Sequence, residues 1–212
     1  MSLSNMSPSK RKQKNTLYKF LTEENGELVS DADKTLKWKI GEWNTYEGDL
    51  EICKSGFHAS RRIADAQSYT HTEILAQVEV MGKSICQRDK EVWGEMKVVN
   101  AWRWTQKDSV EKAIFAAELV VNIFERKYPN DNKPRTAIEA AKAWLKNPTK
   151  KNARAAGAAY AAAADAPADA PAGAAHAAHA AAIIFNKIER WHIEHLKEMK
   201  PYQKKNNQHP LW

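Results

Sequence analysis

The sequence predicts an α+β fold class: a small mixed β-sheet domain at the N-terminal side, followed by an alanine-rich antiparallel helical bundle. Two observations lead to this prediction. Up to about residue 105, short apolar runs alternate with polar residues at a spacing of two, which is typical of half-buried strands. From residue 107 onward apolar residues recur at helical spacing, and 20 of the residues from 153 to 182 are alanine, the strongest helix former.

These patterns divide the chain into four segments. Residues 1–15 are polar and basic with no apolar periodicity, so we expect a disordered basic tail. Residues 16–105 should form the mixed α+β domain, and residues 106–199 the alanine-rich helical domain. A flexible tail is expected over residues 200–212.

The first domain should contain five or six strands and one or two helices. The turn residues Asn25 and Gly26 predict a hairpin, and Ser60 is a candidate N-cap for a helix. Gly82 should end the strand that precedes it. We expect strands at residues 16–21, 27–29, 36–40, 50–53, 74–80 and 95–104.

In the second domain, capping residues and prolines place the breaks between helices. A well-buried helix should begin at Asp108 as its N-cap, Pro134 suits the first turn of the next helix, and Thr149 can cap a third. Pro167 and Pro171 should divide the alanine-rich stretch into two closely packed antiparallel helices.

The charge distribution argues against specific nucleic-acid binding. The net charge is +7, but residues 1–15 carry four basic and no acidic side chains, and residues 197–212 carry four lysines and one glutamate. The tails therefore account for the whole excess, and the folded body is neutral. We expect at most weak nucleic-acid contact through these basic tails, which leaves a basic-tailed nucleic-acid-binding protein as a minor alternative.

The compartment is predicted from what the sequence lacks. No secretory signal pattern opens the chain, and no apolar run approaches the roughly 20 residues needed to span a bilayer. Cys53 and Cys86 fall in apolar, strand-like runs, so we expect them to be buried and without a disulfide. A cytoplasmic protein without membrane contact is expected.

The segment from Gly56 to Arg62 has the most promising local chemistry. His58, Ser60, Arg61 and Arg62 could form an anion or nucleotide site at a helix N-terminus. The alternative interpretation is a turn, a helix cap and two solvated arginines.

Aromatic residues extend this hypothesis. Tyr69, Trp102 and Trp104 could stack a base or anchor a partner, although packing of the core or of a domain interface is the alternative. An ADP-ribosyltransferase-like site is a second possibility, since Tyr18 with Lys19, Tyr69 and Glu95 occupy loosely comparable positions. The first strand, however, lacks the histidine or arginine that those enzymes place there.

No cofactor and no metal site is predicted. His176 with His179, and His192 with His195, form two HxxH pairs on one expected helix. The pairs are about 24 Å apart along a straight helix, so they cannot share one ion. No further ligand motif accompanies either pair, and packing or surface roles are favoured. No phosphate-binding loop or nucleophile motif is present.

Two stretches resemble known families. Residues 124–131 (FERKYPND) and 134–144 (PRTAIEAAKAW), with their alanine-rich continuation, resemble the immunity protein 5-like helical family, which implies binding and neutralising a toxin. Residues 38–41 (WKIG), 50–60 (LEICKSGFHAS) and 78–82 (VEVMG) are similar to an uncharacterised domain of bacteriophage and prophage proteins. The resemblances imply an accessory protein of a phage or mobile element, acting in the bacterial host cytoplasm.

Together these observations predict a non-catalytic binding protein. It would neutralise or sequester a bacterial partner, which could be a toxin, a defence protein or a nucleotide signal. The alternative of an enzyme acting on NAD or another nucleotide requires Tyr18, Tyr69 and Glu95 to converge on one cleft.

Overall fold

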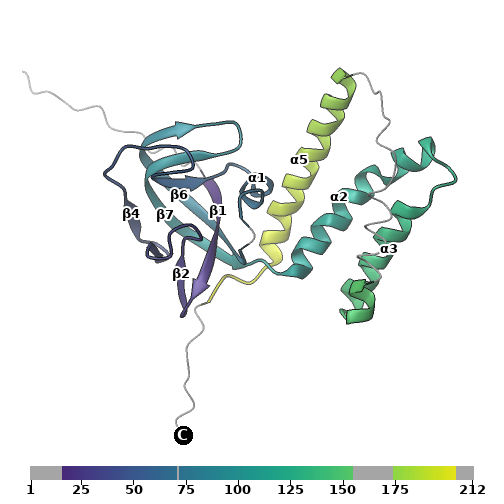
Figure 1. Cartoon of the computed structure of the whole chain (residues 1–212), viewed down its shortest axis with the longest axis horizontal. Helices are drawn as coiled ribbons and strands as arrows, with labels where there is room; N and C mark the ends of the chain where they lie inside the picture. Colours follow the sequence, from purple (N-terminus) through teal and green to yellow (C-terminus); the bar gives the residue numbers. More distant parts are fainter. Residues whose placement is uncertain (1–15, 71, 155–173, 204–212) are drawn as a thin grey trace, which may run out of the picture. The chain divides into compact units, whose positions relative to one another are not determined.

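The computed structural model describes residues 16–70, 72–154 and 174–203, with the backbone alone for residues 174–182 (Figure 1). The chain divides into two compact units. One unit comprises the chain up to Arg103 together with the segment from Lys200, and the other runs from Trp104 to Met199. The first is built on strands and the second on helices, so the predicted α+β class is confirmed.

The order of the elements follows the change in sequence periodicity. The strands are β1 (Thr16–Glu24), β2 (Glu27–Val29), β3 (Lys37–Trp38), β4 (Trp43–Thr45), β5 (Phe57–Ala59), β6 (Ile74–Cys86) and β7 (Glu91–Arg103). The helices are α1 (Ile63–Gln67), α2 (Gln106–Lys127), α3 (Lys133–Lys146) and α5 (Ala174–Glu198).

The strands form one antiparallel sheet in the order β3-β2-β1-β6-β7-β4, and β5 pairs with another part of β7. The long strands β6 and β7 curve through the centre of this unit (Figure 1). Tyr18 in β1 pairs with Ser60, the residue after β5. Backbone pairing therefore runs from β1 through β6, β7 and β5 back to β1, which closes a small barrel-like ring.

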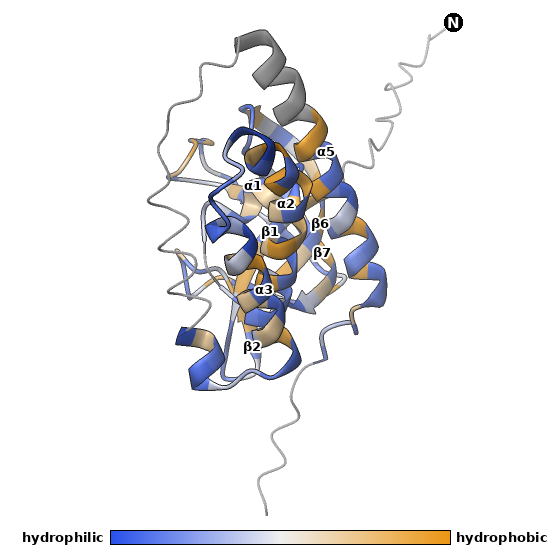
Figure 2. Ribbon diagram, turned by 90° about the vertical axis from the view of Figure 1, so that its right-hand side faces the viewer, coloured by the Kyte–Doolittle hydropathy of each residue, from blue (hydrophilic) through white to orange (hydrophobic). Residues whose placement is uncertain are grey.

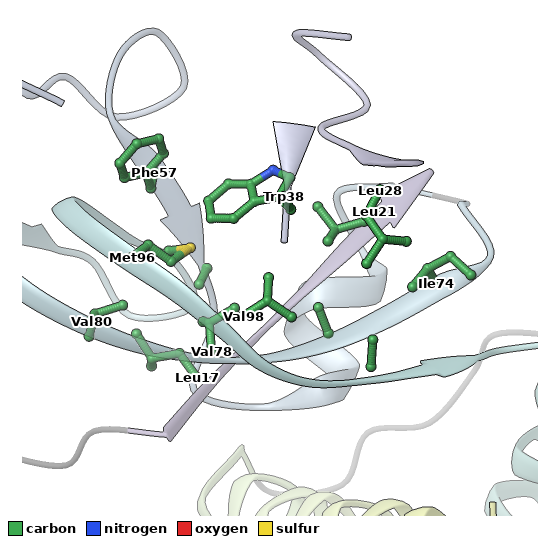
Figure 3. Packing of buried hydrophobic residues seen from close by; sticks show 13 residues of the cluster. Leu17, Leu21, Leu28, Trp38, Phe57, Ile74, Val78, Val80, Met96 and Val98 are labelled. Carbon is green, nitrogen blue, oxygen red and sulfur yellow. The ribbon is translucent and has the colours of Figure 1, made fainter. Parts of the chain in front are cut away.

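The core of this unit lies on the concave face of the ring. Alternation along β1 puts Leu17 and Leu21 on this face, and in β7 the same alternation gives Met96 and Val98. Figure 3 shows these side chains converging with Trp38 and Phe57. The rest of the buried cluster consists of Leu28, Ala59, Ile74, Ala76, Val78, Val80 and Ala101.

The hairpin and the two long strands were predicted, but several boundaries were wrong. β6 does not end at Gly82, because a bulge between Met81 and Ser84 lets the strand continue to Cys86. Gly82 has φ +81°, which a non-glycine residue rarely adopts, so its role is the bulge. β7 correspondingly begins at Glu91, earlier than expected.

Two predicted strands are reduced or missing. The expected strand at residues 36–40 pairs only over Lys37–Trp38, and Ile40 is 47% exposed. Residues 50–53 form a turn instead of a strand, in which the Ser55 amide donates to the Glu51 carbonyl.

The prediction of buried cysteines was also wrong. Cys53 and Cys86 are free and exposed. Cys53 lies in the turn that replaces the expected strand, with φ +66°. Cys86 is the last residue of β6, beyond the buried part of that strand. The expected absence of a disulfide agrees with their free state.

Helix starts were predicted to within a few residues. Thr105, three residues before Asp108, is the N-cap of α2, and the two form a reciprocal capping box. α3 has proline in its first turn, as predicted. The Thr149 hydroxyl accepts a hydrogen bond of 3.2 Å from the Asn152 amide, so this residue does cap a third helical turn. Ser60 caps no helix, since α1 begins later, after Arg62.

The helices are amphipathic, with hydrophobic and hydrophilic residues alternating along α2 and α5 (Figure 2). Ile114 and Val121 of α2 and Ile138 of α3 form a small buried cluster. The predicted packing of alanine-rich helices around Pro167 and Pro171 lies outside the described residues.

The segment after α5 returns to the strand unit. The Tyr202 amide donates a 2.7 Å hydrogen bond to the Ala101 carbonyl, and its hydroxyl donates to Glu23 at 2.9 Å. Arg103 also pairs with Glu23. Residues at three distant points of the sequence thus meet on this side of the sheet. The flexible tail expected from residue 200 therefore begins with an ordered contact.

Candidate functional site

The strand unit contains a cavity of about 540 Å³. Its walls come from β1, β5, the end of α1 and the loops before β3 and after β4. Several side chains that line it were named from the sequence, namely His58, Ser60 and Tyr69. This size is typical of small-molecule sites in proteins.

Lys19 brings a charge to the interior of this unit. It lies between Leu17 and Leu21 on the inward face of β1 and opposite Ala76 of β6. Its Nζ lies 4.2 Å from the centre of the Trp38 ring, a cation–π contact. Burial lowers the pKa of Lys19 to about 7, because removing water disfavours the ammonium form.

His58 is held by the turn that precedes β5. The Cys53 amide donates a 2.8 Å hydrogen bond to His58 Nε2, so this nitrogen carries no proton. Burial lowers the pKa of His58, and the positive charges of Lys90 and Lys19 lower it further. His58 is therefore a neutral imidazole that lies within the field of both lysines.

Lys90 is the second amine of the cavity and is only 9% exposed. Its Nζ lies 3.2 Å from Cys53 Sγ and 3.4 Å from the centre of the Tyr69 ring. The Tyr69 hydroxyl donates to Asp89 at 2.7 Å, and this bond raises the pKa of Tyr69 to about 12. Tyr69 is thus a neutral phenol, and its ring lies against the Lys90 ammonium.

The two predicted arginines are placed differently. Arg61 pairs with Glu91, which is almost fully buried. Arg62 makes two hydrogen bonds to Asp65, of 2.7 and 3.1 Å. Among the described residues, neither arginine lines the cavity. The residues predicted from the sequence therefore fall into two groups. His58, Ser60 and Tyr69 line the cavity, whereas Arg61 and Arg62 form structural ion pairs.

The two predicted tryptophans are also absent from the described lining of the cavity. Trp102 forms a strand-like bridge with Pro201. Trp104 belongs to the helical unit, is 5% exposed, and donates from Nε1 to the Ser109 hydroxyl at 2.9 Å. Its burial excludes base stacking on that ring in this conformation.

The arrangement expected for an ADP-ribosyltransferase-like site is incomplete. Tyr18 and Tyr69 both line the cavity, as that hypothesis required. Glu95 is not among the described lining residues; it pairs with Thr45 of β4 and Met81 of β6, in the middle of β7. The carboxylate that such an enzyme needs therefore does not join the two tyrosines.

A second cluster of polar side chains lies within the helical unit. His195 Nε2 is 2.8 Å from Asp108 Oδ1, and His195 Nδ1 is 3.9 Å from Glu111 Oε2. Trp191 stacks on the His195 ring at 4.5 Å between centres. One nitrogen and two carboxylate oxygens are thus close enough to hold a metal ion.

The Asp108 carboxylate already has a structural role in this cluster. Burial disfavours its ionised form, but hydrogen bonds from Thr105 and from His195 outweigh this, and the pKa of Asp108 lies below its ordinary value. The same carboxylate completes the capping box of α2. The cluster is therefore explained by helix capping and by packing around Trp104. Of the two predicted HxxH pairs, the pair His192 and His195 takes part through His195, and the side chains of the other pair lie outside the described residues.

Among the described residues, none of the helices combines the length and the apolar character needed to cross a bilayer.

Comparison with protein families gives one match for each half of the chain. Residues 17–108 match a domain of unknown function, DUF7666. Residues 104–199 match the Imm-5 like putative immunity protein family. The resemblances to an uncharacterised domain and to the immunity-like family are thereby confirmed, and each match covers somewhat less than half of the chain. Searches of curated proteins and of solved structures gave no match.

The DUF7666 half contains the cavity, and the immunity-like half contains the cluster around His195. Sequence reasoning identified His58, Ser60 and Tyr69, named Lys19 only beside Tyr18 in the ADP-ribosyltransferase-like hypothesis, and missed Lys90. The signal for Lys19 was available, since a lysine at an inward position of a predicted strand breaks the apolar pattern. Lys90 gave no such signal, because only the turn between β6 and β7 brings it to the cavity.

Proposed function

We propose that this protein is a non-catalytic binding protein of phage or mobile-element origin that neutralises or sequesters a bacterial partner in the host cytoplasm. The observation that supports the proposal is the match of residues 104–199 to the immunity-like family. Immunity proteins act by binding, so the immunity-like half is assigned to a protein partner, either a toxin or a defence protein.

The surface of the helices is consistent with such a role. Val120 and Ile123 of α2 are exposed, and Ile123 by 54%. They are three residues apart and therefore lie on neighbouring positions of one helix face. Ile183, Phe185 and Ile193 of α5 are also exposed. Exposed large apolar side chains of this kind are typical anchors of protein–protein contacts.

The test is a protection assay joined to a binding assay. Bacteria that produce the full chain are challenged with a panel of secreted toxins and phage-defence systems, and survival is measured. Any system that is neutralised is then purified, and complex formation is measured by size-exclusion chromatography. We expect Ile123→Glu and Ile183→Glu to reduce both protection and complex formation.

A matched control is Ile40→Glu in the strand unit, where the side chain is 47% exposed. This variant should protect as well as the unchanged protein. Absence of protection against every system in the panel, together with absence of any complex, would contradict the proposal. Substrate turnover by the purified protein would contradict its non-catalytic part.

A further inference from the structure

The charges in the cavity of the DUF7666 half require an explanation. An isolated ammonium group in an apolar interior is costly unless an opposite charge accompanies it. Among the described residues, no carboxylate oxygen lies within 4.0 Å of Lys19 Nζ or Lys90 Nζ. The contacts found instead are aromatic rings and a thiol. Within the described part of the chain, the half-buried Lys19 and the buried Lys90 thus have no counter-charge at contact distance.

The side-chain amines of Lys19 and Lys90 both act on His58. Lys19, His58 and Lys90 line the same cavity, and the positive charges of the two lysines both lower the pKa of His58, in addition to the effect of its burial. His58 is neutral and adds no opposing negative charge. The region around His58 is consequently electropositive, and an anion that enters the cavity would be attracted to it.

The remaining lining indicates what the rest of such a ligand would be. A cavity of about 540 Å³ is far larger than a simple inorganic ion needs. Aromatic residues are among those that line it, namely Tyr46, Phe57 and Tyr69, together with Tyr18 and Phe20 of β1. Hydroxyl groups accompany them at Ser30, Thr45, Ser55 and Ser60.

Carboxylates occur only at exposed positions of the lining. Asp31 accepts a hydrogen bond of 3.3 Å from Thr70, and Asp33 accepts bonds from Thr35. These two acids are available to hydrogen-bond donors such as sugar hydroxyls or exocyclic amines. The lining thus combines cations, aromatic rings and acceptors, which match phosphate, base and sugar respectively.

We infer that this cavity binds a nucleotide, with its phosphate at Lys19 and Lys90 and its base against the aromatic wall. The inference concerns the DUF7666 half alone. It therefore stands independently of the protein partner proposed for the immunity-like half.

The experiment is isothermal titration calorimetry on the purified full chain. The probes are the four ribonucleoside 5′-monophosphates, the four 5′-triphosphates and inorganic phosphate. We expect at least one nucleotide to bind, and to bind more tightly than inorganic phosphate. Lys19→Met and Lys90→Met should each weaken that affinity by about tenfold or more, as expected for losing one charge-assisted contact.

The matched control is Lys39→Met, which removes an exposed lysine that pairs with Glu42 and does not line the cavity. Its affinity for the nucleotide should stay within about twofold of the unchanged protein. A Met variant that fails to fold is recognised by circular dichroism. In that case amide NMR shifts of the unchanged protein on adding nucleotide provide the second measurement, and they should concentrate at Lys19, His58 and Lys90.

Three results would overturn the inference. One is that none of the eight nucleotides binds. Another is that nucleotides bind equally well to the Lys19→Met and Lys90→Met variants, or perturb amides elsewhere. The third is that inorganic phosphate binds as tightly as any nucleotide, which would indicate a site for a simple anion. None of these results bears on protection by the immunity-like half.

Discussion

Tyr18 and Ser60 exchange two backbone hydrogen bonds, each 2.8 Å long. This pair joins β1 to the end of β5 and completes the ring of strands around the core. Both residues also line the cavity, so the contact that closes the sheet is part of the cavity wall. The stability of the ring and the shape of the cavity should therefore depend on one backbone contact.

Replacing Ser60 separates the backbone contribution from that of the side chain. Ser60→Pro removes the amide that donates to Tyr18, and we expect a loss of about 3 kcal/mol in the free energy of unfolding. Ser60→Ala keeps the amide and should cost less than about 1 kcal/mol. Urea denaturation followed by circular dichroism measures both. Equal losses in the two variants would show that the hydroxyl, not the backbone pair, stabilises the ring.

Lys19 should destabilise the protein in the absence of a ligand. Its pKa is about 7 in the folded state and close to the ordinary lysine value when unfolded. Between these values the unfolded chain binds more protons, so stability should rise as the pH increases from about 7 towards 10. Below pH 7 both states are charged, and the cost of burying the charge is constant.

Lys19→Met removes this charge and keeps the apolar stem. We expect it to be more stable than the unchanged protein by about 1–3 kcal/mol at pH 7, with the difference shrinking towards pH 10. Thermal unfolding at several pH values provides the measurement, and Lys39→Met is again the control. The other titratable residues that line the cavity are the same in both proteins, namely Tyr18, Asp31, Asp33, Tyr46, Cys53, Lys54, His58, Tyr69 and Lys90. A destabilised Lys19→Met variant would contradict the prediction.

Gly56 shapes the turn that carries His58. It has φ +83°, and an added Cβ would lie 2.6 Å from Leu50 Cδ2 and 2.7 Å from Val92 Cγ2. Gly56→Ala should therefore cost about 2–4 kcal/mol, from backbone strain and overpacking together. Gly41→Ala is the matched control, since Gly41 has φ +89° with nothing within 4 Å. It should lose only about 1 kcal/mol, so similar losses in both would contradict the role of packing.

Asp108 links α2 to α5 within the immunity-like half. Asp108→Asn weakens the capping box and the bond to His195, and should cost about 1–2 kcal/mol at pH 7. Because the pKa of Asp108 is lowered in the folded state, its contribution is present above the ordinary aspartate pKa and lost as the pH falls below it. Chemical denaturation at pH 7 and pH 3 compares the two proteins, which should differ less at pH 3. Glu139→Gln on the exposed face of α3 should change little at either pH.

The sequence by itself determined the change from strands to helices near residue 105 and most helix boundaries. It also identified the first half of β6, residues 74–80. These features depend on local periodicity and on capping residues, which act over one or two turns of chain. Both family resemblances came from the sequence in the same way, because they rest on short contiguous stretches.

Only the tertiary structure decided which side chains meet at the cavity. Strand pairing at Tyr18 and Ser60, the bulge after Met81 and the turn before β7 together bring Lys19, His58 and Lys90 into one region. The sequence suggested arginines there, but Glu91 and Asp65 take them as ion-pair partners. Whether a charged side chain forms an ion pair depends on its distance from an opposite charge in the folded protein. The spacing of residues along the chain does not specify this distance.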